Sequence, residues 1–118
     1  MMDYCCEVYQ TDETNFNGLN HGDLWVNNNM FKYENENPVD VLLVDFQISW
    51  WNSPVLDLIY FFHTSLQDDL REIAHDELIP FYHVNLVESL AKLNYTGKVP
   101  TLHELQIEYL KKQFYGRN

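Results

Sequence analysis

The stretch HGDLWVNN, residues 21–28, places an aspartate and an asparagine five positions apart, and a second aspartate ends an apolar run in VLLVDFQ, residues 41–47. Asp23 could orient a hydroxyl group, while Asn28 and Asp45 offer the hard oxygen ligands that Mg²⁺ prefers. Phosphoryl transfer needs this combination, because the acceptor must be oriented and the charge on the transferred group must be offset. The three residues predict that chemistry, provided that the two segments meet in space.

A structural interpretation of the same residues is also open. An aspartate can cap a turn, and an asparagine can occupy a left-handed backbone position, without any part in chemistry. Short motifs of this kind have few fixed positions and arise by chance. The second aspartate, placed at a strand end after a gap the length of a hairpin, favours the catalytic interpretation.

The elements around these residues predict how they meet. Two apolar segments, NMFKY and VDVLLVDF, flank the turn-forming ENENP and predict a β-hairpin. A hairpin would bring the loop at residues 21–28 and Asp45 to the same end. The polar residues from Met1 to about Asn20 show no periodicity and predict irregular structure.

The rest of the chain predicts helices. Ser53 has an N-cap side chain and Pro54 suits a first helical position, so a helix is expected to start there. Val55, Leu58 and later apolar residues then fall on one face. Its expected core side chains are Val55, Leu58, Ile59 and Phe62.

A longer helical stretch is expected over residues 67–93, bent or divided at Pro80. Thr101 and Glu104 form a capping-box pattern that opens a last helix, which Gly116 could end. The chain is therefore predicted to be α+β and mainly α-helical. The core candidates of the longer stretch are Leu70, Ile73, Leu78, Phe81, Leu86, Val87 and Leu90.

Length and composition limit the classes of function. With 118 residues, 46% of them hydrophobic, one domain with one core is expected. A formal net charge of -11 argues against nucleic acid and anionic membranes as partners. No apolar run approaches the roughly 20 residues that span a bilayer, and no signal-peptide pattern is present. The adjacent Cys5 and Cys6 give no disulfide framework, which favours a cytoplasmic location.

The sequence resembles the choline-kinase-like and aminoglycoside-phosphotransferase-like small-molecule kinases, most closely their ecdysteroid-kinase-like branch. The resemblance spans roughly residues 19–113, and a protein-kinase-like C-terminal lobe is expected over 19–118 after an irregular segment at 1–18. It implies ATP- and Mg²⁺-dependent transfer to a hydroxyl of a small molecule, with a steroid alcohol as the branch's named example. The segments that resemble the branch are LNHGDLWVNNNMFKY, VLLVDFQIS, SPVLDLIYFFHTS and YTGKVPTLHEL.

The resemblance also implies roles for individual residues. By position, Asp23 would be the catalytic base, with His21 beside it as a support for the loop. Asn28 and Asp45 would hold the metal and, through it, the nucleotide. Asp57 would be the helix carboxylate that braces the loop from below. A carboxylate among apolar neighbours needs hydrogen bonds, although an exposed position on an amphipathic helix is the alternative for Asp57.

The residues between Asp45 and Pro54 are too few for the long segment on which protein kinases bind a peptide. A small acceptor fits this gap better. Within it, Trp50 and Trp51 could form an aromatic wall for an apolar substrate such as a steroid. Packing of the two rings against the helices is the alternative. The family pattern has a basic or smaller residue and a glycine near residues 50–52, so this segment departs from it.

A kinase of this type also needs a glycine-containing loop over the phosphates and a lysine that pairs with them. Only Gly18 precedes Gly22, and the first lysine is Lys32, so the N-terminal lobe is expected to be absent. We therefore predict little or no kinase activity for this chain alone. The alternative is a non-catalytic kinase-like remnant that binds a small molecule or a protein. The sequence leaves the acceptor and the oligomeric state open.

Overall fold

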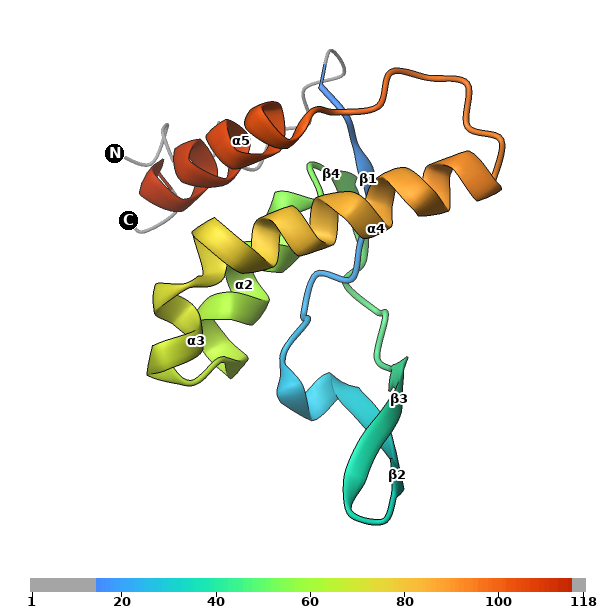
Figure 1. Cartoon of the computed structure of the whole chain (residues 1–118), viewed down its shortest axis with the longest axis vertical. Helices are drawn as coiled ribbons and strands as arrows, with labels where there is room; N and C mark the ends of the chain where they lie inside the picture. The colour runs from blue at the N-terminus through green and yellow to red at the C-terminus, as the bar shows by residue number, and fades with distance from the viewer. Residues whose placement is uncertain (1–14, 116–118) are drawn as a thin grey trace.

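A computed structural model describes residues 15–115, with the side chain of residue 115 left aside. The chain has an α+β architecture in which helices form the body and a hairpin projects from it (Figure 1). In chain order the elements are β1 (Gly18–Asn20), the 3-10 helix η1 (Val26–Asn28), β2 (Asn29–Glu34), β3 (Asn37–Leu43), β4 (Trp50–Asn52), α2 (Val55–Ser65), α3 (Asp68–Glu72), the π-helical turn η2 (Ala74–Leu78), α4 (Ile79–Lys92) and α5 (Leu102–Tyr115).

Strand β1 pairs antiparallel with β4, so that Asn20 lies opposite Trp50. The predicted irregular structure up to about Asn20 is therefore wrong at β1. The strand has no local signal, because its partner lies about thirty residues later and its anchor is polar. The buried side chain of Asn20 donates hydrogen bonds of 3.1 Å to the carbonyl groups of Asn52 and Ser53. Residues 1–14, including Cys5 and Cys6, lie outside the described range.

The predicted hairpin is confirmed as β2 and β3, with Asn29 opposite Leu43. Its turn is shorter than the expected ENENP. Asn35 and Glu36 have φ values of 52° and 69°, and two positive values in succession match the two-residue type I′ turn of hairpins. Asn37 therefore already belongs to β3. The hairpin points away from the helices and is held by its own ladder (Figure 1).

Helix α2 is present as predicted, although the strand β4 before it was not predicted, and the start of the helix differs from the expected cap. Pro54 is the N-cap residue, and no side chain makes a capping hydrogen bond there. Instead the backbone carbonyl of Ser53 accepts a bond of 3.2 Å from the amide of Leu56. The helix is thus placed by the buried turn that links it to β4, rather than by a serine hydroxyl.

The long helical stretch is divided, as predicted, but upstream of Pro80. Helix α3 ends at Glu72, and η2 forms a wider turn in which the amide of Ile79 bonds to the carbonyl of Ala74. Pro80 lies in the first turn of α4. In a regular helix its ring would collide with the carbonyl four residues earlier, that of Asp76. A wider turn at this place accommodates the ring.

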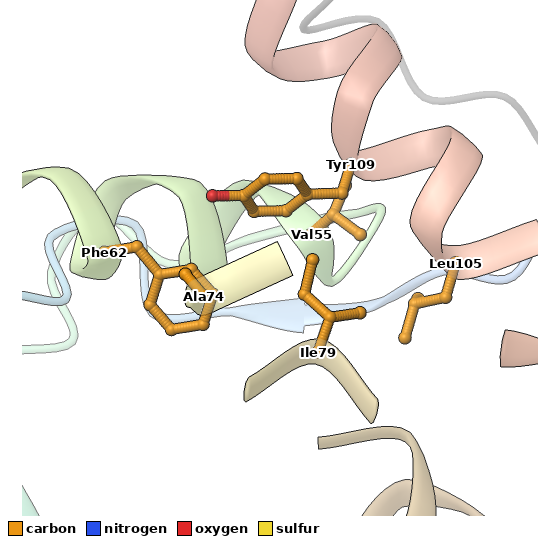
Figure 2. Packing of buried hydrophobic residues seen from close by; sticks show 6 residues of the cluster. All are labelled: Val55, Phe62, Ala74, Ile79, Leu105 and Tyr109. Carbon is orange, nitrogen blue, oxygen red and sulfur yellow. The ribbon is translucent and has the colours of Figure 1, made fainter. Parts of the chain in front are cut away.

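The core lies where α2, η2, α4 and α5 meet (Figure 2). Three expected core residues are wrong, because Phe81 is 70% exposed and Val87 and Leu70 are also exposed, whereas Ile79 is fully buried. The wider turn η2 rotates α4 relative to a continuous helix, which presents a different face to the core. The buried cluster consists of Val55, Phe62, Ala74, Ile79, Leu105 and Tyr109.

Helix α5 opens with the predicted capping box. The amide of Glu104 donates to Thr101 Oγ1 at 3.1 Å, and the amide of Thr101 donates to Glu104 Oε1 at 3.4 Å. With Lys98 nearby, these bonds lower the pKa of the Glu104 carboxyl. Gly116, the expected end signal, lies outside the described range. Across residues 15–115 no helix is long and apolar enough to cross a membrane.

Candidate functional site

The His21–Asn28 loop leaves β1 and lies against helix α2. Asp57, in the first turn of α2, accepts hydrogen bonds from the backbone amides of His21 at 2.7 Å and Gly22 at 3.1 Å. The amide of Asp57 in turn donates to Asn20 Oδ1 at 3.1 Å. The carboxylate therefore has the partners that its apolar neighbours demand. Whether this contact serves a reaction stays a prediction.

The structure brings Asp23 and Asn28 together. Asn28 Nδ2 donates to Asp23 Oδ2 at 3.0 Å and to the backbone carbonyl of Asp23 at 2.9 Å. The 3-10 helix η1 makes this contact possible, since it folds the loop back within five residues. The interval between the two residues thus corresponds to a closed turn with a fixed carboxylate.

A third residue, Tyr60, completes the surroundings of Asp23, and the sequence analysis missed it. Its hydroxyl donates to Asp23 Oδ1 at 2.9 Å. The hydrogen bond to the Asp23 carboxylate, followed by burial and the charge of Asp23, raises the pKa of Tyr60. A signal existed in the sequence, because Tyr60 follows Asp57 by three positions and so shares its helix face.

Helix α2 also holds the far end of the loop. Ser65 Oγ, at the last position of α2, accepts a hydrogen bond of 2.7 Å from the amide of Val26. Together with the bonds of Asp57 and Tyr60, one helix therefore supports the beginning, the middle and the end of the loop. The relative positions of the loop residues depend on this helix.

Gly22 allows the loop to approach the segment that follows β3. Its φ of 90° is left-handed, and a Cβ atom there would collide with the backbone carbonyl oxygen of Ile48. Ser49 Oγ adds a hydrogen bond of 3.2 Å to the carbonyl of His21. The loop and the segment after β3 are thus in direct backbone contact.

The buried ring of His21 joins the loop to the end of β3. Its Nδ1 accepts from the amide of Asp23 at 3.2 Å, and its Nε2 lies 2.6 Å from the carbonyl of Val44. This network assigns the proton to Nε2 and makes the ring neutral. The ring also packs on Phe46, with centroids 4.7 Å apart. Both nitrogens have partners within the protein, as in a support for the loop.

Asp45 lies beside Asn28 at the open end of the hairpin. The amide of Val44 donates to the carbonyl of Asn28 at 3.0 Å, which extends the ladder by one bond beyond β3. Asp45 is the next residue, exposed and with a left-handed φ of 65°. The sequence motifs, separated by a whole hairpin, therefore end next to each other.

That Asn28 and Asp45 hold a magnesium ion at this place stays a prediction. Since Asn28 Nδ2 is used by Asp23, the amide oxygen Oδ1 is the atom that could ligate, together with the carboxylate of Asp45. Within residues 15–115 there is no group of three or more His, Cys, Asp or Glu side chains suited to a metal. A two-ligand site suits Mg²⁺, which keeps its other positions for water and phosphate oxygens.

The two tryptophans lie on β4, away from these contacts. Trp51 is 59% exposed and pairs with Leu19 across the sheet, and Trp50 pairs with Asn20. Trp51 also lines a hollow of about 430 Å³ together with Phe16 and Tyr95. No residue of the His21–Asn28 loop lines this hollow, so the structure does not bring Trp51 and Asp23 into one cavity. A role of Trp50 and Trp51 in substrate binding stays a prediction.

Comparison with known proteins gives the family. Residues 1–95 match the model of the ecdysteroid kinase-like family, and this segment includes Asp23, Asn28, Asp45 and Asp57. The chain therefore belongs to the ecdysteroid kinase-like family, as the sequence resemblance implied. The later connector YTGKVPTLHEL lies beyond the match except for its first residue. No curated protein and no solved structure matches the chain.

Proposed function

We propose that this chain provides the catalytic loop and the metal-binding positions of an ATP- and Mg²⁺-dependent phosphotransferase that acts on a hydroxyl group of a small molecule. The family is kinase-like, which supports the reaction type. The observation on which the proposal rests is that Asn28 fixes the carboxylate of Asp23 while its backbone pairs beside Asp45.

In this proposal Asp23 orients the acceptor hydroxyl and receives its proton as the oxygen bonds to the γ-phosphorus of ATP, while the bond from that phosphorus to the bridging oxygen breaks and ADP leaves. A carboxylate has about four lone-pair positions, so Asp23 can accept this hydrogen bond in addition to those it already has. Asn28 and Asp45 would hold Mg²⁺, which when bound offsets the negative charge of the phosphates. Asp57 keeps the backbone of His21 and Gly22 in place during these events.

The acceptor is proposed to be a small hydroxylated molecule, with steroid alcohols as the class that the family description suggests. The short segment from Asp45 to β4 supports a small acceptor, since it leaves no length of chain on which to bind a peptide. A cytoplasmic setting is proposed from the sequence, in which Cys5 and Cys6 are adjacent and form no disulfide framework.

The sequence has no lysine before Lys32 and no glycine-rich segment. Phosphate contacts of the kind that such groups make would be missing from a site built on Asn28 and Asp45. We therefore propose that this chain corresponds to a C-terminal lobe, and that alone it binds nucleotide weakly and turns over little or no substrate.

The test is a titration of the full, ¹⁵N-labelled chain with a non-hydrolysable ATP analogue, with and without Mg²⁺, followed by NMR. We expect the amide signals of Asn28 and Asp45 to shift only when Mg²⁺ and nucleotide are both present. Asp45→Ala should abolish the shift of Asn28. Asp40→Ala is the matched control, because Asp40 is an exposed carboxylate on the same hairpin and bonds only to the adjacent amide of Val41.

The proposal fails if nucleotide binds equally well without Mg²⁺, if Asp45→Ala leaves the shifts unchanged, or if no shift appears at millimolar nucleotide.

The hollow beside Trp51 supports the second candidate, a non-catalytic module that binds a small molecule. Its lining combines the aromatic rings of Phe16, Trp51 and Tyr95 with the charged side chains of Lys98 and Glu104, which suits a small ligand that carries both a ring and polar groups. Ligand-induced shifts around this hollow, without any nucleotide response, would favour that function.

A further inference from the structure

We propose that Tyr60 is a positioning residue for Asp23, and that it fixes the orientation of the carboxylate relative to helix α2. The inference rests on the proposed function, in which Asp23 is the base. The structural observation behind it is independent, namely the hydrogen bond of 2.9 Å from the Tyr60 hydroxyl to Asp23 Oδ1.

Two donors on different elements determine how the carboxylate lies. The torsion that turns an aspartate carboxylate is broad, so a single hydrogen bond to one oxygen leaves its plane poorly defined. Asn28 holds Oδ2 from within the loop, whereas Tyr60 holds Oδ1 from helix α2. Of these two bonds, the one from Tyr60 ties the carboxylate to helix α2.

Both donors are neutral, which matters for a group that must take up a proton. Among residues 15–115, no lysine, arginine or histidine forms an ion pair with Asp23. The carboxylate is therefore oriented by hydrogen bonds from two uncharged side chains. Tyr60 is 40% exposed, so its hydroxyl holds Asp23 at the protein surface, where an acceptor can reach it.

The helix connects this contact to the rest of the loop. Asp57, one turn before Tyr60, holds the amides of His21 and Gly22, and Ser65 holds the amide of Val26. Those bonds fix backbone atoms and would persist without the Tyr60 hydroxyl. The hydroxyl instead acts on the side chain that serves as the base in the proposed reaction. Loss of this atom should alter Asp23 while the fold remains.

The test uses Tyr60→Phe in the full chain and observes the side-chain amide of Asn28 by ¹⁵N NMR. This amide donates to the other oxygen of Asp23, so it reports on the carboxylate directly. We expect the Asn28 side-chain signals to shift and broaden in Tyr60→Phe. They should stay unchanged in Tyr33→Phe, a control at an exposed tyrosine on the hairpin. Unchanged Asn28 signals in Tyr60→Phe would overturn the proposal.

A second readout follows the tyrosine itself, by ¹³C labelling at Cζ. The Tyr60 signal, identified by its loss in Tyr60→Phe, should titrate above the ordinary value of about 10. Its midpoint should fall in Asp23→Asn, because the carboxylate that favours the protonated phenol is gone. An equal midpoint in both proteins would contradict the inference. Neither readout needs nucleotide, so the proposed function can fail in its own titration while this contact is upheld.

Discussion

The His21–Asn28 loop and the β2–β3 hairpin follow each other in the sequence, yet they are held in different ways. Side chains of helix α2 bind the loop through Asp57, Tyr60 and Ser65. The hairpin has every residue from 30 to 43 exposed, and its regular hydrogen bonds lie within its own ladder. The loop therefore depends on the helical body, whereas the hairpin depends on its turn and register.

The candidate site residues are therefore positioned in two different ways. The positions that bear Asp23 and Asn28 are set by tertiary contacts, and Asp45 is placed by the register of the hairpin. A change in α2 should disturb the first pair and leave the ladder intact. A change on the exposed faces of the hairpin should disturb neither the Asp23–Asn28 contact nor the ladder.

The largest effect is expected for Asp57→Ala. It leaves the amides of His21 and Gly22 without their charged acceptor, and hydrogen bonds to charged groups contribute about 1.5–3 kcal/mol each. Allowing for partial exposure, the free energy of unfolding should fall by roughly 3 kcal/mol. Urea denaturation measures this change, with the exposed Asp69→Ala as control. A loss below about 1 kcal/mol would show that the loop does not depend on this carboxylate.

Gly22→Ala should be next in size. A left-handed backbone disfavours a β-carbon by about 1–2 kcal/mol, and the contact with the carbonyl of Ile48 adds to this. We expect a loss of about 2 kcal/mol in the free energy of unfolding. Gly18→Ala is a matched control, because a β-carbon at Gly18 has no neighbour within 4 Å. Equal stability of the two variants would refute the close approach of the loop to Ile48.

A smaller effect on stability is expected at Asp45, and it should differ from the effect on nucleotide binding. Its φ of 65° suits glycine, so Asp45→Gly should be more stable than Asp45→Ala by about 1 kcal/mol. Both variants should lose the Mg²⁺-dependent nucleotide shifts. Thermal denaturation and the nucleotide titration together test whether Asp45 is kept for its oxygen atoms rather than for its backbone. Retained Mg²⁺-dependent shifts in Asp45→Gly would exclude it as a metal ligand.

The smallest effect is expected on the hairpin. Leu42 is 63% exposed on β3, so Leu42→Ser should change the free energy of unfolding by no more than about 0.5 kcal/mol. The side-chain amide of Asn28 should keep its NMR signals. A larger loss of stability, or shifts that reach Asn28, would mean that the hairpin and the loop are coupled more strongly than their contacts indicate.

The parts of the fold with local signals could be predicted from the sequence. The hairpin has two apolar segments around a turn, and the capping box at Thr101 and Glu104 involves residues three positions apart. Strand β1 was missed because its anchor, the buried Asn20, bonds to residues more than thirty positions away. The prediction of which face of α4 is buried was wrong, because the periodicity of the sequence does not indicate the wider turn η2.

The candidate site shows the same limit. The motif spacing indicated Asp23, Asn28 and Asp45, and the family resemblance indicated Asp57; the structure gives the first two a direct contact. Tyr60 was overlooked, since its partner is close only after the loop has folded onto α2. The spacing of three positions from Asp57 places Tyr60 on the same helix face, but it does not reveal which distant residue the hydroxyl contacts.

The placement of Pro80 has one more consequence. The wider turn before it contains one residue more than an α-helical turn. Side chains of α4 are therefore rotated by about 100° around the helix axis, compared with a regular helix. Substitution by alanine would restore the missing amide and remove the steric need for that turn. We expect the turn to tighten in that variant and the buried Ile79 to become more exposed. In this expectation the ring of Pro80 is one determinant of which side of α4 faces the core.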